Sequence, residues 1–434
     1  MYTFEIKEYR AVKEARIRID GITVLAGINS SGKSTLSRWL YYLVNAIHNF
    51  ELHQRCYFID SLETEIQKIY RVFRVSPKGA NYRSIINQIR HYKFDKEYDL
   101  DSLKNVYYSF VKKAENDLRD LVDSEPFNKR LVYYLYGDIA SSEINEQDVI
   151  ETYIKECLCV FENGMTNYFH KIETCSVEDL DKVIMSEYSD GQAIPLNISF
   201  IEGETLLFGG DRFFQPLMLS RAIYIDSPMT VSGTGYTRVS YPWSDLHYYL
   251  YTENIQKINP ITNRLNLQIQ SIIGGSIQLM DDKFNLEKEL RYINQVQGIN
   301  INLNEVATGI KSFAYMSQLL NNGWLDKETL LLIDEPEAHL HPQWIVEFAR
   351  LLVNIHKHYG VKILVASHNP DMVAAIQSIS NKENILDKTV FYLAEKEKDQ
   401  YRYSFIDKST DIADIFASFN IAISRIEMYG TPII

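Results

Sequence analysis

The nonapeptide GINSSGKST occupies residues 27–35, directly after the apolar run ITVLA at residues 22–26. It matches the pattern G-x-x-x-x-G-K-[S/T] at every position, and the next residues repeat apolar side chains with helical periodicity. Glycines in such a loop let backbone N–H groups turn inward around an anion, and the helix start adds the positive end of its dipole. Because strand, loop and helix follow in this order, we predict that residues 27–35 bind nucleotide phosphates.

The side chains of this loop have separate predicted tasks. Lys33 is expected to reach the β- and γ-phosphates, the hydroxyl of Ser34 to ligate Mg²⁺, and Thr35 to support the phosphates. The predicted nucleotide-binding residues are Gly27, Asn29, Ser30, Ser31, Gly32, Lys33, Ser34 and Thr35.

A second motif, TLLLIDEP at residues 329–336, places two carboxylates at the end of an aliphatic run. Unpaired buried charge is costly, so adjacent carboxylates at a strand end indicate a cation or a reaction. We expect Asp334 to hold Mg²⁺ and Glu335 to polarise an attacking water. An ordinary helix cap at a strand end explains neither the pair nor the apolar run before it.

Two further segments are candidates for the same site. His368 follows the predicted strand VKILVAS one strand–helix–strand unit after Asp334. A lone histidine is more often structural, but beside the carboxylates it is expected to contact the γ-phosphate and the attacking water. The segment ATGIKSF at residues 307–313 opens a helix with Thr308 and Gly309, which is again an anion-binding geometry. Since one phosphate loop is already present, this second nest either serves the nucleotide of another subunit or is an ordinary capped helix.

Composition and charge limit the classes of function. The chain has 434 residues, with 57 Asp and Glu against 45 Lys and Arg, and a net charge of −12. This balance argues against a surface that coats DNA, although it leaves room for a local basic groove. The longest apolar runs fall short of the roughly 20 residues that cross a bilayer, and the start MYTFEIKEYR is charged. We therefore expect a cytoplasmic protein without a membrane partner.

The pattern along the chain predicts an α/β head interrupted by a helical insertion. Residues 3–7 and 15–19 alternate like a β-hairpin, and amphipathic helical stretches follow from about residue 55 to 190. One helix is expected at about 244–270, then strands near SIQLM and GININL. Residues 227–244 are expected to form a long loop. The predicted organisation is a head segment at 1–54, the insertion at 55–192 and a second head segment at 193–434.

Together the four motifs resemble the ATP-binding-cassette (ABC) fold, in the variant of RecF, the SMC proteins and the overcoming-lysogeny-defect (OLD) ATPases. GINSSGKS is similar to the Walker A of that group, DEPEAHLHP to its extended Walker B, and Ser367-His368 to its switch-histidine loop. The segment TGIKSF resembles a relaxed signature motif, with Thr308 where serine is usual. The likeness covers about residues 1–50 and 195–425.

The resemblance implies a P-loop ABC-type ATPase head with a mixed sheet, and ATP and Mg²⁺ as cofactors. It gives Lys33, Glu335 and His368 the catalytic roles, and Ser34 and Asp334 the metal. Residues of the signature, Thr308, Gly309 and Lys311, would act on the nucleotide of a partner chain. The glutamine loop of the family has no clear counterpart, and the candidates are Gln88, Gln215, Gln268 and Gln270.

His339 and His341, beside Glu337, admit two interpretations. Two histidines and a carboxylate could suggest a metal site. In the family that the chain resembles, however, this segment follows the Walker B turn where subunits meet. We therefore favour packing and hydrogen bonding for both histidines.

One phosphate loop and one signature per chain imply a head-to-tail homodimer, or a higher assembly built from it, with two ATP molecules at an isologous interface. No room for a Toprim nuclease is expected after His368. The chain therefore resembles the regulatory ATPases of the Septu, retron and PARIS anti-phage systems, whose effector is a separate nuclease or toxin. The alternative is a RecF-like DNA-binding ATPase, which net charge disfavours. A transporter ATPase is disfavoured by the long insertion.

Overall fold

The computed structural model describes residues 1–93, 99–124, 135, 146–226, 243–254, 260–281, 288–398 and 401–419. The chain divides into two compact units, one of Met1–His48 with Leu180–Ile434 and one of Asn49–Asp179. The sequence placed these divisions later, at 54/55 and 192/193. The second division falls earlier because the π-helix η2 (Ile184–Tyr188) packs against α1 (Lys33–His48) of the first unit, with the rings of Tyr41 and Tyr188 6.2 Å apart.

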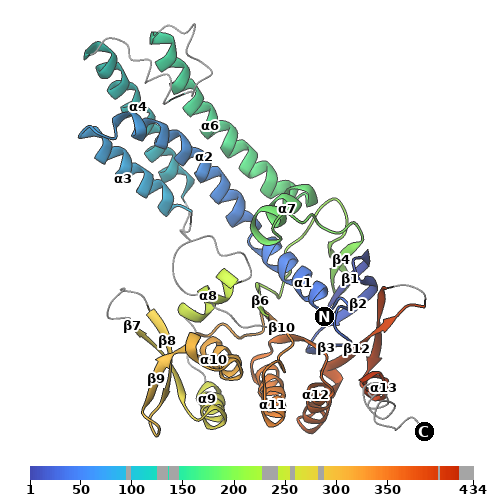
Figure 1. Ribbon diagram of the computed structural model, residues 1–434. Coiled ribbons are helices and arrows are strands. Elements are labelled where there is room, and N and C mark those ends of the chain that lie inside the picture. The colour runs from blue at the N-terminus through green and yellow to red at the C-terminus, as the bar shows by residue number, and fades with distance from the viewer. Residues whose placement is uncertain are drawn as a thin grey trace, which may run out of the picture. The chain divides into compact units, whose positions relative to one another are not determined.

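The first unit is built on a ten-stranded mixed sheet with the order β5-β4-β1-β2-β13-β12-β3-β11-β10-β6 (Figure 1). Strands β12, β3, β11, β10 and β6 are parallel to their neighbours in this group, whereas β13 is antiparallel to β12. The mixed α/β sheet agrees with the predicted fold class. The strands are β1 (Tyr2–Tyr9), β2 (Val12–Ile19), β3 (Ile22–Ala26), β4 (Ile198–Glu202), β5 (Thr205–Phe208), β6 (Arg221–Ile225), β10 (Thr329–Asp334), β11 (Lys362–Ser367), β12 (Thr389–Lys396) and β13 (Tyr403–Ser409).

The predicted N-terminal hairpin is confirmed. Strands β1 and β2 pair antiparallel, with Phe4 opposite Ile17 and Ile6 opposite Ala15. These four residues are fully buried, whereas intervening residues such as Glu5 and Arg16 are not. The period of two that predicted the strands therefore reflects one buried face.

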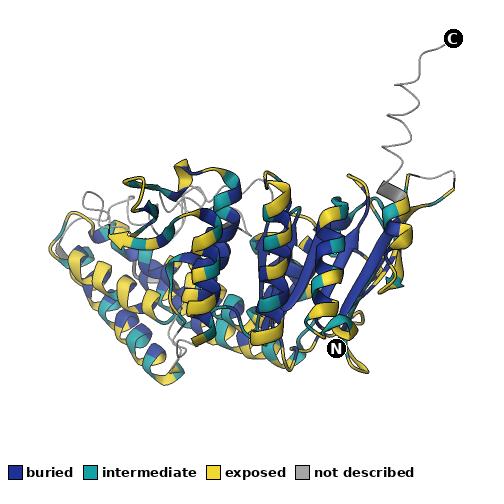
Figure 2. Cartoon of the chain, turned by 90° about the horizontal axis from the view of Figure 1, so that it is seen from below, coloured by how far each residue is buried: buried dark blue, intermediate teal, exposed yellow. Residues whose placement is uncertain are grey.

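Helices cover both faces of the parallel strands (Figure 1). On one face α1 packs against β6, β10 and β11. The other face carries a core shared by α10 (Thr308–Asn321), α11 (Pro342–Tyr359) and α12 (Pro370–Lys382), into which alternate strand residues such as Leu331 and Ile333 project. Figure 2 shows buried strands behind helices whose outer sides are exposed. This two-sided burial explains the aliphatic runs of β3, β10 and β11.

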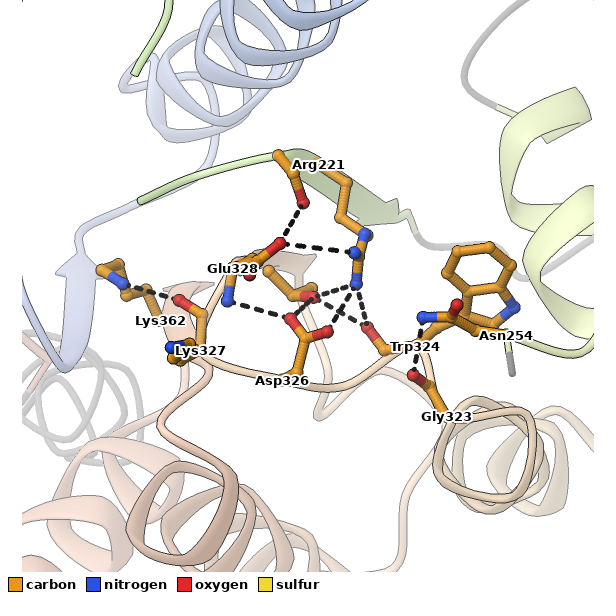
Figure 3. A network of polar contacts seen from close by, with 10 residues as sticks. Arg221, Asn254, Gly323, Trp324, Asp326, Lys327, Glu328 and Lys362 are labelled. Atoms are coloured by element: carbon orange, nitrogen blue, oxygen red, sulfur yellow. Dashed lines mark hydrogen bonds and ion pairs between the residues drawn. The ribbon is translucent and has the colours of Figure 1, made fainter. Parts of the chain in front are cut away.

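A polar network ties the strands together at the edge where β6 and β10 begin (Figure 3). The guanidinium of Arg221 donates to the carboxylate of Asp326 at 2.9 Å and to the Thr329 hydroxyl at 3.2 Å, and it lies 5.4 Å from the Trp324 ring centroid. Lys362 donates to the Lys327 carbonyl at 2.9 Å. These contacts anchor the edge of the sheet opposite to the ends of β3, β10 and β11.

A separate three-stranded antiparallel sheet follows the order β7-β8-β9. The single helix expected at 244–270 was wrong, because two helices, α8 (Trp243–Tyr251) and α9 (Pro260–Ile273), occupy this segment. Pro260 opens α9, where its fixed φ and missing N–H are tolerated, but it could not continue an earlier helix. The strand β8 was not predicted, and the loop expected at 227–244 lies outside the described residues as far as 242. The elements here are β7 (Ser276–Asp281), β8 (Lys288–Asn294), β9 (Ile299–Asn302) and the 3₁₀ turn η3 (Leu303–Glu305).

The second unit is helical, and three of its described tyrosines are fully buried core residues. Tyr82, Tyr107 and Tyr153 are fully buried, and their hydroxyls donate to Asp117, to the Cys157 carbonyl and to the Glu65 carbonyl. These three rings are thus unavailable for stacking on nucleic-acid bases. Its helices are α2 (Phe50–Phe73), α3 (Lys78–His91), α4 (Leu100–Ser124) and α6 (Glu146–Thr174), and α7 (Val177–Val183) spans the division.

The remaining elements, η4 (Leu386–Lys388) and α13 (Ala413–Phe419), flank the last two strands. Within the described residues, the helices are all too short or too polar to cross a bilayer.

Candidate functional site

Three adjacent strands end at one edge of the large sheet, and each delivers a predicted site residue there. The strand β11 lies between β3 and β10, with Ser367 opposite Ala26 and Ala366 opposite Asp334. The glycine loop that follows β3, the Ser367-His368 step and the Asp334-Glu335 pair are therefore neighbours. Carboxyl ends of parallel strands are the usual ligand edge of an α/β sheet.

The loop between β3 and α1 has a backbone that requires glycine. Gly32 has φ +99°, and a Cβ placed on it would lie 2.6 Å from Cγ2 of Val12. A Cβ on Gly27 would lie 2.7 Å from the Cβ of Ala394. Ser30 also adopts a positive φ of 65°. The loop is thus a tight backbone turn that packs against the neighbouring strands and leads into the start of α1.

Lys33 is folded back over this loop. It is 5% exposed, and its Nζ donates to the carbonyls of Gly27 and Ile28, both at 2.8 Å. Burial lowers the pKa of Lys33, and the charges of Glu335 and Asp334 oppose this shift. The buried Oγ of Ser31 lacks a hydrogen-bond partner among the described residues. A buried ammonium beside an unpartnered hydroxyl and helix-start N–H groups fits an incoming phosphate.

Asp334 is 1% exposed and is surrounded by hydroxyl donors. The Ser37 hydroxyl donates to its Oδ1 at 2.8 Å, and the Tyr224 hydroxyl donates to its Oδ2 at 2.6 Å. Burial raises the pKa of Asp334, while hydrogen bonds from Tyr224, Ser34 and Ser37 work in the opposite direction. The structure therefore brings Ser34 and Asp334 together, as a shared Mg²⁺ site requires, and an oxygen donor set suits that ion.

Sequence reasoning missed Tyr224 and the residues behind it. Arg38 of α1 donates to the Tyr224 hydroxyl at 3.3 Å and pairs with Asp226 at 3.0 Å. Ser37 could have been predicted from the sequence, since it lies one helical turn after Lys33 and therefore on the same side of α1. Tyr224 could not have been predicted in this way, because it is the parallel pairing of β6 with β10 that places it beside Asp334.

Glu335 begins the turn after β10 in a left-handed conformation. Its φ is +48°, which is uncommon for a residue other than glycine and often found at functional sites. Its backbone N–H donates to the Ala366 carbonyl at 2.8 Å, which fixes the turn to β11. Its side chain is 34% exposed, with Oε1 3.4 Å from Nδ1 of His368. The predicted base and the predicted phosphate-sensing histidine are thus adjacent.

Glu337 is a third acidic residue of the site. Its Oε1 accepts the Ser367 hydroxyl at 2.8 Å and the His368 backbone N–H at 2.9 Å. Burial raises its pKa, against the lowering effect of these hydrogen bonds. The sequence had considered Glu337 only as a neighbour of His339 and His341.

His339 and His341 have local roles in the backbone. The Nδ1 of His341 accepts the Gln343 N–H at 3.4 Å and caps α11. His339 adopts φ +64° in the preceding turn. Among the described residues, no group of three His, Cys, Asp or Glu side chains is arranged to hold a metal. The hydrogen bond and the turn accord with the packing interpretation.

The predicted signature residues lie at the start of α10. Ala307 precedes the helix without a side-chain cap, and Lys311 donates to the Asn304 carbonyl at 2.8 Å. A Cβ on Gly309 would lie 3.0 Å from the His339 carbonyl oxygen, so packing within the chain alone favours glycine there. The uncapped N–H groups at the start of α10 remain suited to binding an anion. The glycine at position 309, in contrast, is explained by packing within the chain.

The candidates for a glutamine loop are scattered. Gln88 belongs to α3 of the helical unit, Gln215 and Gln270 are exposed, and Gln268 contacts Glu347 at 3.4 Å. The structure does not single out one of them.

Two family models match the chain. One is described as "AAA ATPase domain" and matches residues 1–195, which include the glycine loop. The other is described as "AAA domain, putative AbiEii toxin, Type IV TA system" and matches residues 238–374, which include Asp334, Glu335 and His368. Both are ATPase domains, and together with the geometry they support a P-loop ATPase.

One curated relative matches a short part of the chain. The energy-coupling factor transporter ATP-binding protein EcfA3 of Clostridium perfringens is 29% identical over 105 residues, which are 24% of this chain and 36% of that protein. The chain thus matches about a third of the length of that relative.

Two structures of SMC heads cover nearly the whole chain at low similarity. The Smc head domain of Pyrococcus furiosus, bound to the C-terminal domain of ScpA, is 11% identical with a TM-score of 0.36 and covers 99% of this chain and 100% of that one. The SMC head domain of Thermotoga maritima is 10% identical with a TM-score of 0.34 and covers 93% and 97%. Similarity of this degree does not by itself define a shared fold.

Proposed function

We propose that the chain binds ATP with Mg²⁺ at the edge formed by β3, β11 and β10 and hydrolyses it. The observation that carries the proposal is the convergence of the glycine loop, Asp334-Glu335 and His368 on three adjacent strand ends. Lys33 would exchange the Gly27 and Ile28 carbonyls for phosphate oxygens, which satisfy its ammonium equally well. Ser34 and Asp334 would hold Mg²⁺, which neutralises phosphate charge.

Glu335 and His368 are the groups suited to the chemical step. The Glu335 carboxylate is partly exposed, so it can accept a proton from a water that enters beside the γ-phosphate. His368, 3.4 Å from that carboxylate, would contact the γ-phosphate and hold the same water. The backbone hydrogen bond from Glu335, which has φ +48°, to Ala366 fixes the main chain of this residue relative to β11.

The active form that we propose is a homodimer with ATP at the interface. Support comes from α10, whose first N–H groups are not capped by a side chain and whose start carries Thr308 and Gly309. In an isologous pair, this helix start would face the γ-phosphate held by the partner. ATP then stabilises the closed pair, and hydrolysis releases it, because ATP has a higher affinity for the closed state.

We further propose that this cycle regulates a separate effector, a nuclease or toxin, in anti-phage defence. The motif resemblance to regulatory defence ATPases supports this role, as does the family description that names a toxin–antitoxin system. The helical unit, Asn49–Asp179, is a compact body with its own aromatic core and is suited to docking a partner.

Glu335→Gln tests the dimer and the ATPase together. The amide keeps the shape of the side chain but cannot accept the proton, so hydrolysis should fall at least about 100-fold, which is the range of general-base catalysis. Light scattering with ATP and Mg²⁺ should show dimers that persist in the variant and disperse in the parent. Parent-like hydrolysis in the variant would reassign Glu335, and monomers with full turnover would overturn the dimer.

The regulatory role is tested in cells that express the chain together with the protein encoded beside it. We expect protection against phage that depends on Lys33 and Glu335. ATP-dependent DNA binding that weakens steeply with salt, without protection, would instead favour the DNA-binding alternative.

A further inference from the structure

Glu337 is a buried carboxylate that accepts hydrogen bonds at one of its two oxygens. Only 3% of its side chain is exposed. Oε1 accepts hydrogen bonds from the Ser367 hydroxyl and the His368 N–H, whereas Oε2 is buried and has no hydrogen-bond partner among the described residues. An incompletely satisfied carboxylate is costly to bury, so this acid lowers the stability of the fold.

The imidazole of His368 lies between two carboxylates. Its buried Nδ1 is 3.4 Å from Oε1 of Glu337 and 3.4 Å from Oε1 of Glu335, which are ion-pair distances, and it makes no hydrogen bond to either acid among the described residues. A ring nitrogen that faces a carboxylate carries the proton, and this sets the tautomer and the direction of the other nitrogen. Nδ1 therefore faces the acids, and Nε2 is left for a further ligand.

The two carboxylates differ in how they are held. Glu335 reaches β11 through its backbone N–H, and its side chain is partly exposed. Glu337 reaches β11 through its side chain, by two hydrogen bonds to consecutive residues at the strand end. Of the two acids, it is Glu337 whose side chain hydrogen-bonds the main chain of His368, and its Oε1 also lies beside the ring.

We propose that Glu337 is a positioning residue that fixes the end of β11 and orients His368, so that Nε2 meets the γ-phosphate. The inference rests on the proposed ATPase function of this site. Glu337 acts through His368 and contacts neither ATP nor the attacking water. The other charged groups near it are Lys33, on whose ammonium its charge acts, and Glu335.

A double-mutant cycle tests whether Glu337 acts through His368. Glu337→Ala should lower kcat for ATP at least tenfold and change KM less than threefold. In a His368→Ala background, the same substitution should change kcat less than threefold, because the group it orients is gone. Equal fold losses in the two backgrounds would overturn the proposal.

The conservative variant separates orientation from a general loss of packing. Glu337→Gln retains an oxygen that can accept from Ser367 and from the His368 N–H. It should raise kcat at least threefold above Glu337→Ala. A glutamine no better than alanine would count against positioning, and thermal unfolding of each variant checks that it is folded.

A readout without ATP distinguishes failure of this inference from failure of the proposed function. In the full chain labelled with ¹⁵N-histidine and free of nucleotide, the His368 resonances, identified by His368→Gln, should report a proton on Nδ1. Glu337→Ala should give a mixture of tautomers, whereas Glu383→Ala, which removes a partly exposed acid paired with Lys357, should not. An unchanged tautomer in folded Glu337→Ala would overturn the inference. If the tautomer changes as expected but the parent does not hydrolyse ATP, the proposed function fails and the positioning stands.

Discussion

The hydroxyl of Tyr224 on strand β6 donates a 2.6 Å hydrogen bond to the carboxylate of Asp334 on the neighbouring strand β10. Both oxygens of Asp334 are thereby engaged before any ligand arrives, since Ser37 donates to the other one. The buried carboxylate that we expect to bind Mg²⁺ is thus held in one rotamer by hydroxyl groups from a strand and a helix. Preorganisation of this kind reduces the entropy lost when the ion binds.

Removing the Tyr224 hydroxyl should destabilise the protein. Tyr224→Phe leaves Asp334 one donor short, and hydrogen bonds to charged groups contribute about 1.5–3 kcal/mol. The matched control is Tyr359→Phe, because the Tyr359 hydroxyl bonds the neutral Thr262 hydroxyl at 2.7 Å and should contribute about 1 kcal/mol. Denaturant unfolding at pH 8 measures both. A loss for Tyr224→Phe no larger than that of the control would contradict the assigned strength of this contact.

Replacing Asp334 with asparagine should stabilise the protein when nucleotide is absent and should remove the stabilisation that ATP and Mg²⁺ give to the parent. Its pKa is raised in the folded chain by burial. The folded state therefore binds the proton more readily than the unfolded state, and stability is lost as pH rises from the unfolded pKa through the folded one. Above that window Asp334→Asn should unfold at a higher temperature than the parent without nucleotide. With ATP and Mg²⁺ only the parent should gain stability.

Thermal unfolding from pH 4 to 8, with and without ATP and Mg²⁺, checks this prediction. The variant should show a flatter dependence on pH. If Asp334→Asn is less stable than the parent at pH 8 without ligand, then the hydrogen bonds around the carboxylate outweigh its burial.

A methyl group on Gly32 should disrupt the phosphate loop. Gly32→Ala meets Cγ2 of the buried Val12 and must also adopt φ +99°. Gly191→Ala is the matched control, since Gly191 has φ +84° with nothing within 4 Å of an added Cβ. Strain alone should cost each about 1–2 kcal/mol, whereas the clash adds about 1–3 kcal/mol for Gly32. Only Gly32→Ala should weaken ATP binding by calorimetry, and equal effects would show that the loop adapts.

Breaking the network at the opposite sheet edge should affect stability without affecting the site. Arg221→Ala removes contacts to Asp326 and Thr329, with only 14% of the arginine side chain exposed, and should cost about 2–3 kcal/mol (Figure 3). Lys357→Ala breaks a more exposed pair with Glu383 and should cost less than about 1 kcal/mol. Both variants should keep kcat/KM for ATP within threefold of the parent at temperatures where they are folded. A larger drop in Arg221→Ala would show that this edge is coupled to the site.

Much of the arrangement of the candidate site could be predicted, because its signals are local in sequence. Residues 22–35 predict a strand, a glycine turn and the start of a helix in chain order, and the positive φ of Gly32 agrees with the need for glycine in that turn. The aliphatic run before Asp334 likewise predicts a strand buried on both faces. His368 could be placed beside the carboxylates because one strand–helix–strand unit brings consecutive strand ends together. The helix expected at 244–270 failed for a local reason too, since the break before Pro260 was not given its weight.

The chain by itself determined which backbone segments bear phosphate-binding and acidic groups, since strand and helix periods and glycine turns arise between near neighbours. Tertiary structure alone decided that Tyr224 supports Asp334 and that Glu337, rather than solvent, holds the end of β11. Those contacts join residues 110 and 30 positions apart, through strand pairing and through a turn folded onto the adjacent strand. Neither tyrosine nor glutamate carries a pattern that names its partner, because hydrogen bonds across strands depend on register and burial, which exist only once the sheet has formed.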